Sequence, residues 1–189
     1  MSRREELVEK VVYVGEVFAS SQPARVQTLL GSCVAACLYD EAARIGGLNH
    51  FLLPGTARRD ADAARYGVHA MELLINRLMQ LGAERGRLQA KVFGGANLRG
   101  FGSLRVGTRN REFVREFLKT EGIPIRAGRL GGNQPLQVRF YTETGRAMVR
   151  ALGRQEGQLL QEVAVEERSM RSRLEKPLWE PDEYVLFEQ

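Results

Sequence analysis

The sequence predicts a layered α/β protein, an α+β sandwich with a mixed β-sheet core, two main helices and a C-terminal helical extension. Two observations support this fold class. Apolar runs rich in β-forming residues come in groups instead of alternating strictly with helices, which favours layered sheets over a doubly wound fold. The chain of 189 residues, 43% of them hydrophobic, is also long enough to bury a core without disulfide staples.

Three apolar runs in the first third of the chain predict neighbouring strands at residues 25–30, 33–39 and 45–53, after a short first strand at residues 11–14. Gly31 and Ser32 alone separate the first two runs, which predicts a tight bend or a bulge. The runs are continuous in their hydrophobicity, as expected for strands that are buried on both faces.

Two helical patterns are interleaved with the remaining strands. Apolar residues recur at helical spacing across residues 60–82 and again from about residue 109 to 121. A glycine stands at the end of each pattern, where it favours a helix C-terminus. Further strands are predicted at residues 89–93, 123–127 and 136–141, with glycine pairs in the intervening turns.

The character of the sequence changes after Gly145. Residues 146–174 predict one long, charge-rich helix with a thin apolar stripe that includes Val163 and Met170. We therefore expect a main domain at residues 1–150 and a helical, acidic-aromatic extension at residues 151–189.

Charge is divided unevenly along the chain. Residues 155–189 hold four Lys or Arg and nine Asp or Glu, a net charge of −5, whereas the whole chain carries +5 and residues 1–154 therefore carry +10. This complementarity predicts that the acidic tail docks on the basic body. The basic residues are scattered, without the aromatic-interleaved stripe of a nucleic-acid binder, so we expect no nucleic-acid partner.

The chain ends and the cysteines predict a cellular compartment. The N-terminus is charged and no apolar run reaches the length of a membrane span, so we expect a cytoplasmic protein without membrane insertion. Cys33 and Cys37 would lie about 13 Å apart on one strand, which is too far for a disulfide and favours a reducing environment.

Cys33 and His50 are the candidate catalytic residues. A cysteine acts as a nucleophile only as the thiolate, which needs a nearby base such as histidine. Gly31 and Ser32, just before Cys33, allow close approach of a substrate, and backbone N–H groups at the bend would hold a developing oxyanion. Taken alone, an isolated cysteine in an apolar strand is more often an inert core residue, which is how we interpret Cys37.

Other chemistries find less support. Cys33, Cys37 and His50 lack the pair spacing of a zinc site, so we expect neither a metal nor another cofactor. His69 lies within the first helical pattern and is interpreted as a surface or structural residue. The glycine pairs lack the dinucleotide and P-loop signatures. They are interpreted as turns, and the segment around Phe93 and Gly94 is a candidate border of the substrate cleft.

Several motifs together resemble the CheD family of chemoreceptor glutamine deamidases. They occur in the family's order across roughly residues 10–150: LGSCVAACLYD at 30–40, GLNHFLLP at 47–54, RYG at 65–67, AM and LL at 70–74, KVFGGA at 91–96, VG and RN at 106–110, GG at 131–132 and TG at 144–145. A single Gly-Ser-Cys would be a weak signal, whereas the ordered series is specific.

The resemblance implies a layered α/β sandwich and a cytoplasmic enzyme that hydrolyses selected glutamine side chains on methyl-accepting chemotaxis receptors to glutamate and ammonia. It implies that Cys33 is the nucleophile, that His50 is the base and that a threonine upstream of the cysteine orients the histidine. Thr28 fits that position, and Gln27 is the alternative. Gly31, Ser32, Phe93 and Gly94 are expected around the substrate or the oxyanion.

Two alternatives to a deamidase are compatible with the sequence. One is a non-catalytic binding module that regulates receptors or a CheC-type phosphatase of the response regulator, a partner that the resemblance implies. The other is a basic nucleic-acid binder. An intact set of Thr28, Cys33 and His50 favours the enzyme, because a pure binding module needs none of the three.

Overall fold

The computed structural model describes residues 7–53, 60–98 and 104–175, and within them the strands form two sheets. The four-stranded sheet has the order β1-β3-β8-β9 and the five-stranded sheet the order β2-β5-β4-β6-β7. The strands are β1 (Val8–Val11), β2 (Val17–Ser20), β3 (Ala24–Leu30), β4 (Val34–Asp40), β5 (Ile45–Phe51), β6 (Gln89–Gly94), β7 (Ile125–Leu130), β8 (Leu136–Tyr141) and β9 (Ala147–Ala151). The helices are α1 (Asp60–Gln80), the short 3₁₀ turn η1 (Arg85–Arg87), α2 (Leu104–Thr120) and α3 (Gly157–Glu175).

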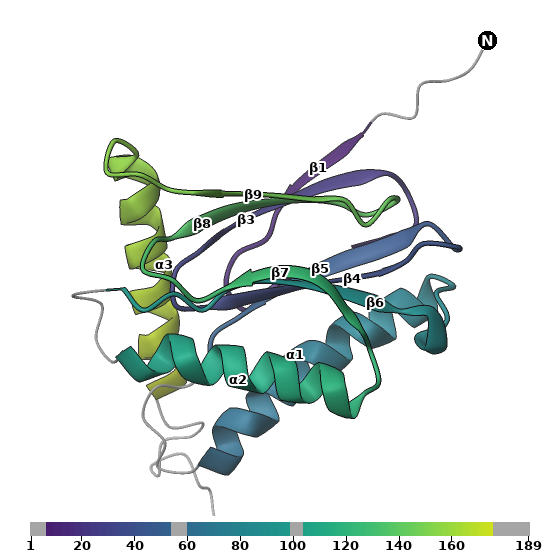
Figure 1. The fold of residues 1–189 in the computed structure, drawn as a ribbon, viewed down its shortest axis with the longest axis horizontal. Coiled ribbons are helices and arrows are strands. Elements are labelled where there is room, and N and C mark those ends of the chain that lie inside the picture. Colours follow the sequence, from purple (N-terminus) through teal and green to yellow (C-terminus); the bar gives the residue numbers. More distant parts are fainter. Residues whose placement is uncertain (1–6, 54–59, 99–103, 176–189) are drawn as a thin grey trace, which may run out of the picture.

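The elements stack in three layers (Figure 1). The four-stranded sheet lies above the five-stranded sheet, and α1 and α2 cover the other face of the five-stranded sheet. One apolar cluster fills the space between that sheet and the two helices, and a second fills the space between the sheets. The central strands β4 and β5 of the five-stranded sheet are thus buried on both faces, which explains their continuous apolar runs.

Side-chain alternation assigns each central residue to one of the two cores. In β4, Val34, Ala36 and Leu38 face the helices, whereas Ala35 and Cys37 face the second sheet. Cys33, just before β4, belongs to the core between the sheets.

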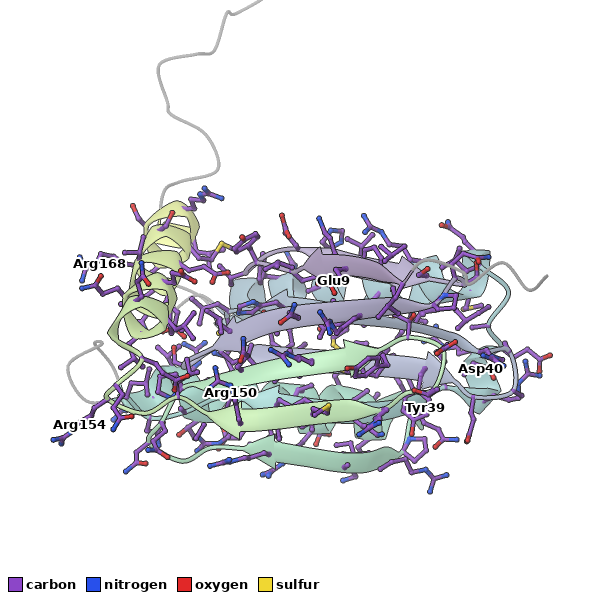
Figure 2. The ribbon with its side chains drawn as sticks, turned by 90° about the horizontal axis from the view of Figure 1, so that it is seen from above. Glu9, Tyr39, Asp40, Arg150, Arg154 and Arg168 are labelled. Atoms are coloured by element: carbon purple, nitrogen blue, oxygen red, sulfur yellow. The ribbon has the colours of Figure 1, made fainter. Side chains whose placement is uncertain are left out.

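Helix α3 stands apart from the layers and lies across one end of the molecule (Figure 1). Seen from above, the labelled Arg168 of α3 lies at that end, and Tyr39 and Asp40 at the end of β4 lie at the other (Figure 2). Cys33, which precedes β4, is therefore at the end that α3 covers. The buried residues Val163 and Met170 show that the apolar stripe of this helix is its inner face.

The layered fold class and most predicted elements are confirmed. The strands near residues 25–30, 33–39, 45–53, 89–93 and 136–141 and the helix at 60–82 are present with small changes at their ends. The segment Gly31–Cys33 is the predicted tight bend.

Four predicted elements need correction. The first strand is β1, not residues 11–14, because its pairing with β3 sets Val8 against Ala24 and Val11 against Gln27. Strand β2 was not predicted; it is a short edge strand on β5. The strand predicted at 123–127 is β7 (Ile125–Leu130), which pairs in parallel with β6.

Helix α2 begins at Leu104, five residues before the predicted start. Gly107 falls inside it because the helix approaches the strand-end backbone closely: a side-chain carbon at this position would lie 2.4 Å from the carbonyl oxygen of Ala96.

The largest error is the single helix predicted over residues 146–174. Residues 147–151 form β9, which pairs with β8, and α3 begins only at Gly157. Gly145, with a φ of +64°, closes the hairpin between β8 and β9, so tertiary pairing overrides the helical preference of the segment.

Some predictions are not addressed by the described residues. Residues 176–189 of the acidic tail lie outside them, and the division into segments 1–150 and 151–189 stays a prediction. Among the described residues, no helix is long and apolar enough to cross a membrane.

Candidate active site

Thr28 lies in the interior because the side chains of β3 alternate between the core and the outer face. Its even-numbered residues face the core between the sheets and its odd-numbered residues are partly exposed. Thr28 is therefore buried, whereas Gln27 faces outward and accepts a hydrogen bond from Nε of Arg139 at 3.2 Å. Of the two residues considered from the sequence, Thr28 is the one that reaches the core.

The bend that carries Cys33 is fixed by backbone hydrogen bonds to the end of β6. The N–H of Gly95 donates to the carbonyl oxygen of Cys33 at 2.6 Å, and the N–H of Ala96 donates to that of Gly31 at 2.9 Å. Gly94, at a φ of +102°, allows this contact, because a side-chain carbon there would lie 2.3 Å from the Cys33 carbonyl oxygen. The bend is thereby held in one conformation.

Asn110 adds a side-chain brace to the same bend. Its Nδ2 donates to the carbonyl oxygen of Ser32 at 2.8 Å, and its Oδ1 accepts the N–H of Leu53 at 2.8 Å. Because Asn110 is completely buried and satisfied at both ends, it ties the cysteine bend to the chain just beyond His50.

His50 lies on β5, opposite Ala35 of β4, and is buried. Its backbone is held on the other side by two hydrogen bonds. Its N–H donates to the backbone carbonyl oxygen of Glu16 at 3.1 Å, and its own carbonyl oxygen accepts the N–H of Gly15 at 2.7 Å. The imidazole therefore points into the space between the sheets from a rigid strand.

The three side chains form a continuous hydrogen-bonded relay. His50 Nε2 lies 2.8 Å from Cys33 Sγ, and His50 Nδ1 lies 2.9 Å from Thr28 Oγ1. The Thr28 hydroxyl also donates to the carbonyl oxygen of Val12 at 2.7 Å.

The relay sets the tautomer of His50. A carbonyl oxygen only accepts, so the Thr28 proton is directed to Val12 and the Thr28 oxygen accepts from His50. The proton of neutral His50 then resides on Nδ1, and Nε2 is free to accept the thiol proton of Cys33.

Burial keeps both members of the cysteine–histidine pair uncharged. Burial lowers the pKa of His50 to about 4, so the imidazole is a neutral base at physiological pH. Burial and the negative charge of Glu167 raise the pKa of the Cys33 thiol well above its usual value. The site therefore holds a thiol beside a neutral imidazole, and proton transfer has to accompany attack on a substrate.

Two glutamates of α3, neither of them predicted, lie at the site. Glu166 Oε1 is 3.8 Å from His50 Nδ1 and accepts a hydrogen bond from the N–H of Val14. Burial raises the pKa of Glu166. When this carboxylate is ionised, its charge favours the imidazolium that forms after proton transfer.

The second glutamate, Glu167, contacts the cysteine bend directly. Its Oε1 accepts the backbone N–H of Cys33 at 3.1 Å, and its Oε2 accepts the hydroxyl of Ser32 at 2.9 Å. The N–H expected to stabilise an oxyanion is thus occupied by a side chain of α3. The sequence signal for this contact is the position of Glu167, a charged residue on the apolar stripe between Val163 and Met170.

The other site residues from the sequence fall into two groups. Gly31 and Gly94 border the Cys33 bend through their backbones. Phe93 is buried with Cys33 in the core between the sheets. Its contact with substrate stays a prediction.

The residues interpreted as non-catalytic are both away from the relay. Cys37 is buried in the same core, and burial raises the pKa of its thiol. His69 is exposed on α1. No cluster of three or more His, Cys, Asp or Glu side chains suited to a metal ion occurs within the described ranges.

A buried cysteine, a histidine on its Sγ and a hydroxyl on the far imidazole nitrogen form the arrangement used by thiol-dependent hydrolases. The comparisons with known proteins narrow this class. The family model described as "CheD chemotactic sensory transduction" matches residues 52–151.

Curated relatives match a longer part of the chain. A probable chemoreceptor glutamine deamidase CheD from Stenotrophomonas maltophilia strain K279a is 53% identical over 150 residues, covering 79% of this chain and 74% of the relative. A protein of the same name from Xanthomonas campestris pv. campestris strain B100 is 54% identical with the same coverage, and one from Shewanella oneidensis is 50% identical over 143 residues, covering 73% and 69%. This protein belongs to the CheD family.

Two solved structures show a weaker likeness. The Bacillus licheniformis hypothetical protein YfiH gives a TM-score of 0.40 at 13% identity, covering 60% of this chain and 49% of its own. A Neisseria meningitidis protein gives 0.41 at 10% identity, covering 65% and 63%.

Proposed function

We propose that this protein is a glutamine deamidase that hydrolyses selected glutamine side chains on chemotaxis receptors to glutamate and ammonia. The observation that carries the proposal is the relay in which Cys33, His50 and Thr28 are joined by hydrogen bonds of 2.8 and 2.9 Å. It occurs in a chain that is 53% identical over 150 residues to relatives named as chemoreceptor glutamine deamidases.

In the first half of the reaction, His50 Nε2 takes the proton of Cys33 as the sulfur attacks the carboxamide carbon. The C=O bond becomes an oxyanion, which the N–H of Cys33 is placed to stabilise once Glu167 has left it. The imidazolium then gives its proton to the amide nitrogen, ammonia departs, and the acyl group remains on sulfur as a thioester.

In the second half, His50 removes a proton from water, and the resulting hydroxide attacks the thioester. The sulfur leaves and is reprotonated by His50, so the products are a glutamate side chain and the original thiol. Thr28 keeps Nδ1 as the donor throughout, so that Nε2 alone exchanges protons. No step requires a metal or another cofactor.

The family resemblance supports three further parts of the proposal. The substrates are the cytoplasmic domains of methyl-accepting receptors, the enzyme acts in the cytoplasm, and a CheC-type phosphatase is a candidate regulatory partner. The relay favours the enzyme over a pure binding module, since a binding surface needs no buried cysteine–histidine pair.

Mass spectrometry of a receptor cytoplasmic fragment after incubation with the protein tests this function. Selected receptor glutamines should gain the mass that accompanies replacement of NH2 by OH, and ammonia should appear in equal amount, with and without a metal chelator. An unaltered fragment after incubation with folded protein would overturn the proposal.

A further inference from the structure

Helix α3 carries a carboxylate on its buried face. Val163, Glu167 and Met170 are only 1%, 3% and 8% exposed, so Glu167 lies among residues that pack the helix against the body. Burying an ionised carboxylate is unfavourable unless hydrogen bonds compensate for lost hydration. The partners of Glu167 therefore indicate what this position is built to hold.

Those partners belong to the candidate active site. Oε1 accepts the N–H of Cys33 at 3.1 Å, and Oε2 accepts the Ser32 hydroxyl at 2.9 Å. Arg171, one turn further along α3, lies 3.7 Å from Oε2 and donates to Ser32 Oγ at 3.2 Å. Both body donors are on the bend that positions the thiol.

The bend is shaped to receive α3. A side-chain carbon at Gly31 would lie 2.6 Å from Glu167 Oε1 and 2.9 Å from Val163 Cγ1, which leaves no room for one. The close approach of the helix to Cys33 therefore depends on the glycine. A helix packed against Gly31 can therefore bring a glutamate or glutamine side chain to the cysteine bend.

The chemistry of the two donors fits a carboxamide as well as a carboxylate. The N–H of Cys33 can donate to either a carboxamide oxygen or a carboxylate oxygen. The Ser32 hydroxyl donates to a carboxylate but can turn to accept from an amide NH2 group. A glutamate is also the product of glutamine deamidation, so Glu167 resembles the product that the enzyme itself releases.

We propose that Glu167 occupies the subsite of the substrate carboxamide, formed by the Cys33 N–H and the Ser32 hydroxyl, and that α3 is a built-in, product-like inhibitor. This inference rests on the proposed deamidase function. The helix has to withdraw before a receptor glutamine binds, because one oxyanion donor cannot serve two acceptors at once.

Two further observations agree with this inhibition. Cys33 is 0% exposed while α3 is in place, so the covered form offers no thiol to a substrate. Glu167 also raises the pKa of the Cys33 thiol and so disfavours formation of a thiolate beside it.

The packing of α3 is incomplete along one flank. A groove of about 740 Å³ runs between α3 and the strands β1 and β3, with Val12, Thr28, Glu166 and Met170 among its lining residues. A helix with an open flank loses fewer contacts when it shifts than one enclosed on all sides.

Alkylation of the two thiols with iodoacetamide tests the covering role without any receptor. Both cysteines are buried, so each should react slowly in the wild type. In Glu167→Ala, Cys33 should react at least roughly tenfold faster, because loss of a single charged hydrogen bond already corresponds to about that factor. Cys37, which lies within β4 in the same core, should keep its rate and so report that the fold is intact.

Glu162→Ala is the matched control, because Glu162 is an exposed glutamate of the same helix. It should leave the rate at Cys33 unchanged. Equal Cys33 rates in Glu167→Ala and Glu162→Ala would overturn the covering role. Since this assay involves no receptor, that result is distinct from failure of the proposed function.

The Glu167→Gln variant tests the subsite itself. The introduced glutamine places a carboxamide beside Cys33, and the sulfur should attack its carbon, release ammonia with the proton from His50 and leave a thioester that water hydrolyses to glutamate. Peptide mapping should show position 167 regaining the mass of glutamate over time, and Cys33→Ala in the same background should prevent it.

The same variant separates the two possible failures. A glutamine that persists at position 167 in a protein that deamidates receptors would overturn the subsite assignment and leave the function standing. A protein that converts neither its own glutamine nor a receptor glutamine would overturn the assignment together with the function.

Discussion

The Oγ1 atom of Thr28 lies 2.9 Å from Nδ1 of His50, and this contact joins the two sheets. Thr28 comes from β3 of the four-stranded sheet and His50 from β5 of the five-stranded sheet. The geometry that sets the histidine tautomer therefore depends on how the sheets pack.

Replacing Thr28 by valine should disable the relay without changing the shape of the core. The variant leaves the Nδ1–H of His50 and the carbonyl oxygen of Val12 without their partner. We expect a fall in kcat of roughly ten- to a hundredfold, as for loss of one hydrogen bond to the imidazolium formed in the reaction, and a loss of about 1–3 kcal/mol in the free energy of unfolding. Thr28→Ser should restore most of both, in an assay of receptor deamidation combined with urea unfolding.

Gln27→Ala is the control for that series, because Gln27 lies on the outer face of the same strand and contacts Arg139. If Thr28→Val matched Gln27→Ala in kcat and in its pH profile, Thr28 would have no positioning role.

The stability of the protein should depend on pH through His50. Its pKa is about 4 when folded and 6.5 in a model peptide, so the unfolded chain takes up the proton first as pH falls. The free energy of unfolding should therefore decrease by about 3 kcal/mol between pH 7 and pH 4 from this residue alone. Above pH 7 His50 no longer contributes to the pH dependence of the free energy of unfolding, because it is neutral in both states.

The difference between wild type and His50→Gln isolates this term. Glu166, whose pKa is raised by burial, contributes with the opposite sign in both proteins, so the difference retains only its coupling to His50, whose Nδ1 lies 3.8 Å from Glu166 Oε1. Urea midpoints measured from pH 7 to pH 4 should converge as the pH falls. Parallel curves for the two proteins would show that His50 is not held neutral.

Gly94→Ala should damage the site more than the same change at Gly122. Both glycines have a positive φ, +102° and +69°, so each substitution costs about 1 kcal/mol or more in backbone strain. Only at Gly94 does the new carbon also meet an atom, the Cys33 carbonyl oxygen, at 2.3 Å.

We expect Gly122→Ala to remain active with a modestly lower Tm and Gly94→Ala to lose activity and more of its Tm. The comparison requires thermal melts and receptor deamidation rates for both variants. Equal losses in the two would mean that strain alone matters at Gly94.

The elements that could be predicted from the sequence are those whose signals are local. The continuous apolar runs of β4 and β5, the Gly31–Ser32 bend and the periodicity of α1 were all recognisable, and the pairing of Cys33 with His50 followed from two adjacent strands. The choice of Thr28 over Gln27 required knowing which residues of β3 face the core, and that depends on how the two sheets pack.

The remaining features depend on long-range contacts. Strand β9 has residues that favour a helix and becomes a strand only because β8 offers an edge. In the sequence, Glu167 is one of many charged residues in a charge-rich helix. Its role follows only from its contact with Cys33, which is 134 residues away in sequence.

The central claim is that Cys33, and not its buried neighbour Cys37, is the nucleophile, and a pair of alanine variants tests it most directly. Receptor fragments are incubated with Cys33→Ala or Cys37→Ala, and glutamine conversion is followed by peptide mass spectrometry, with circular dichroism to confirm folding. The account predicts no conversion with Cys33→Ala and wild-type sites of conversion with Cys37→Ala. Conversion by folded Cys33→Ala at the wild-type rate would contradict it.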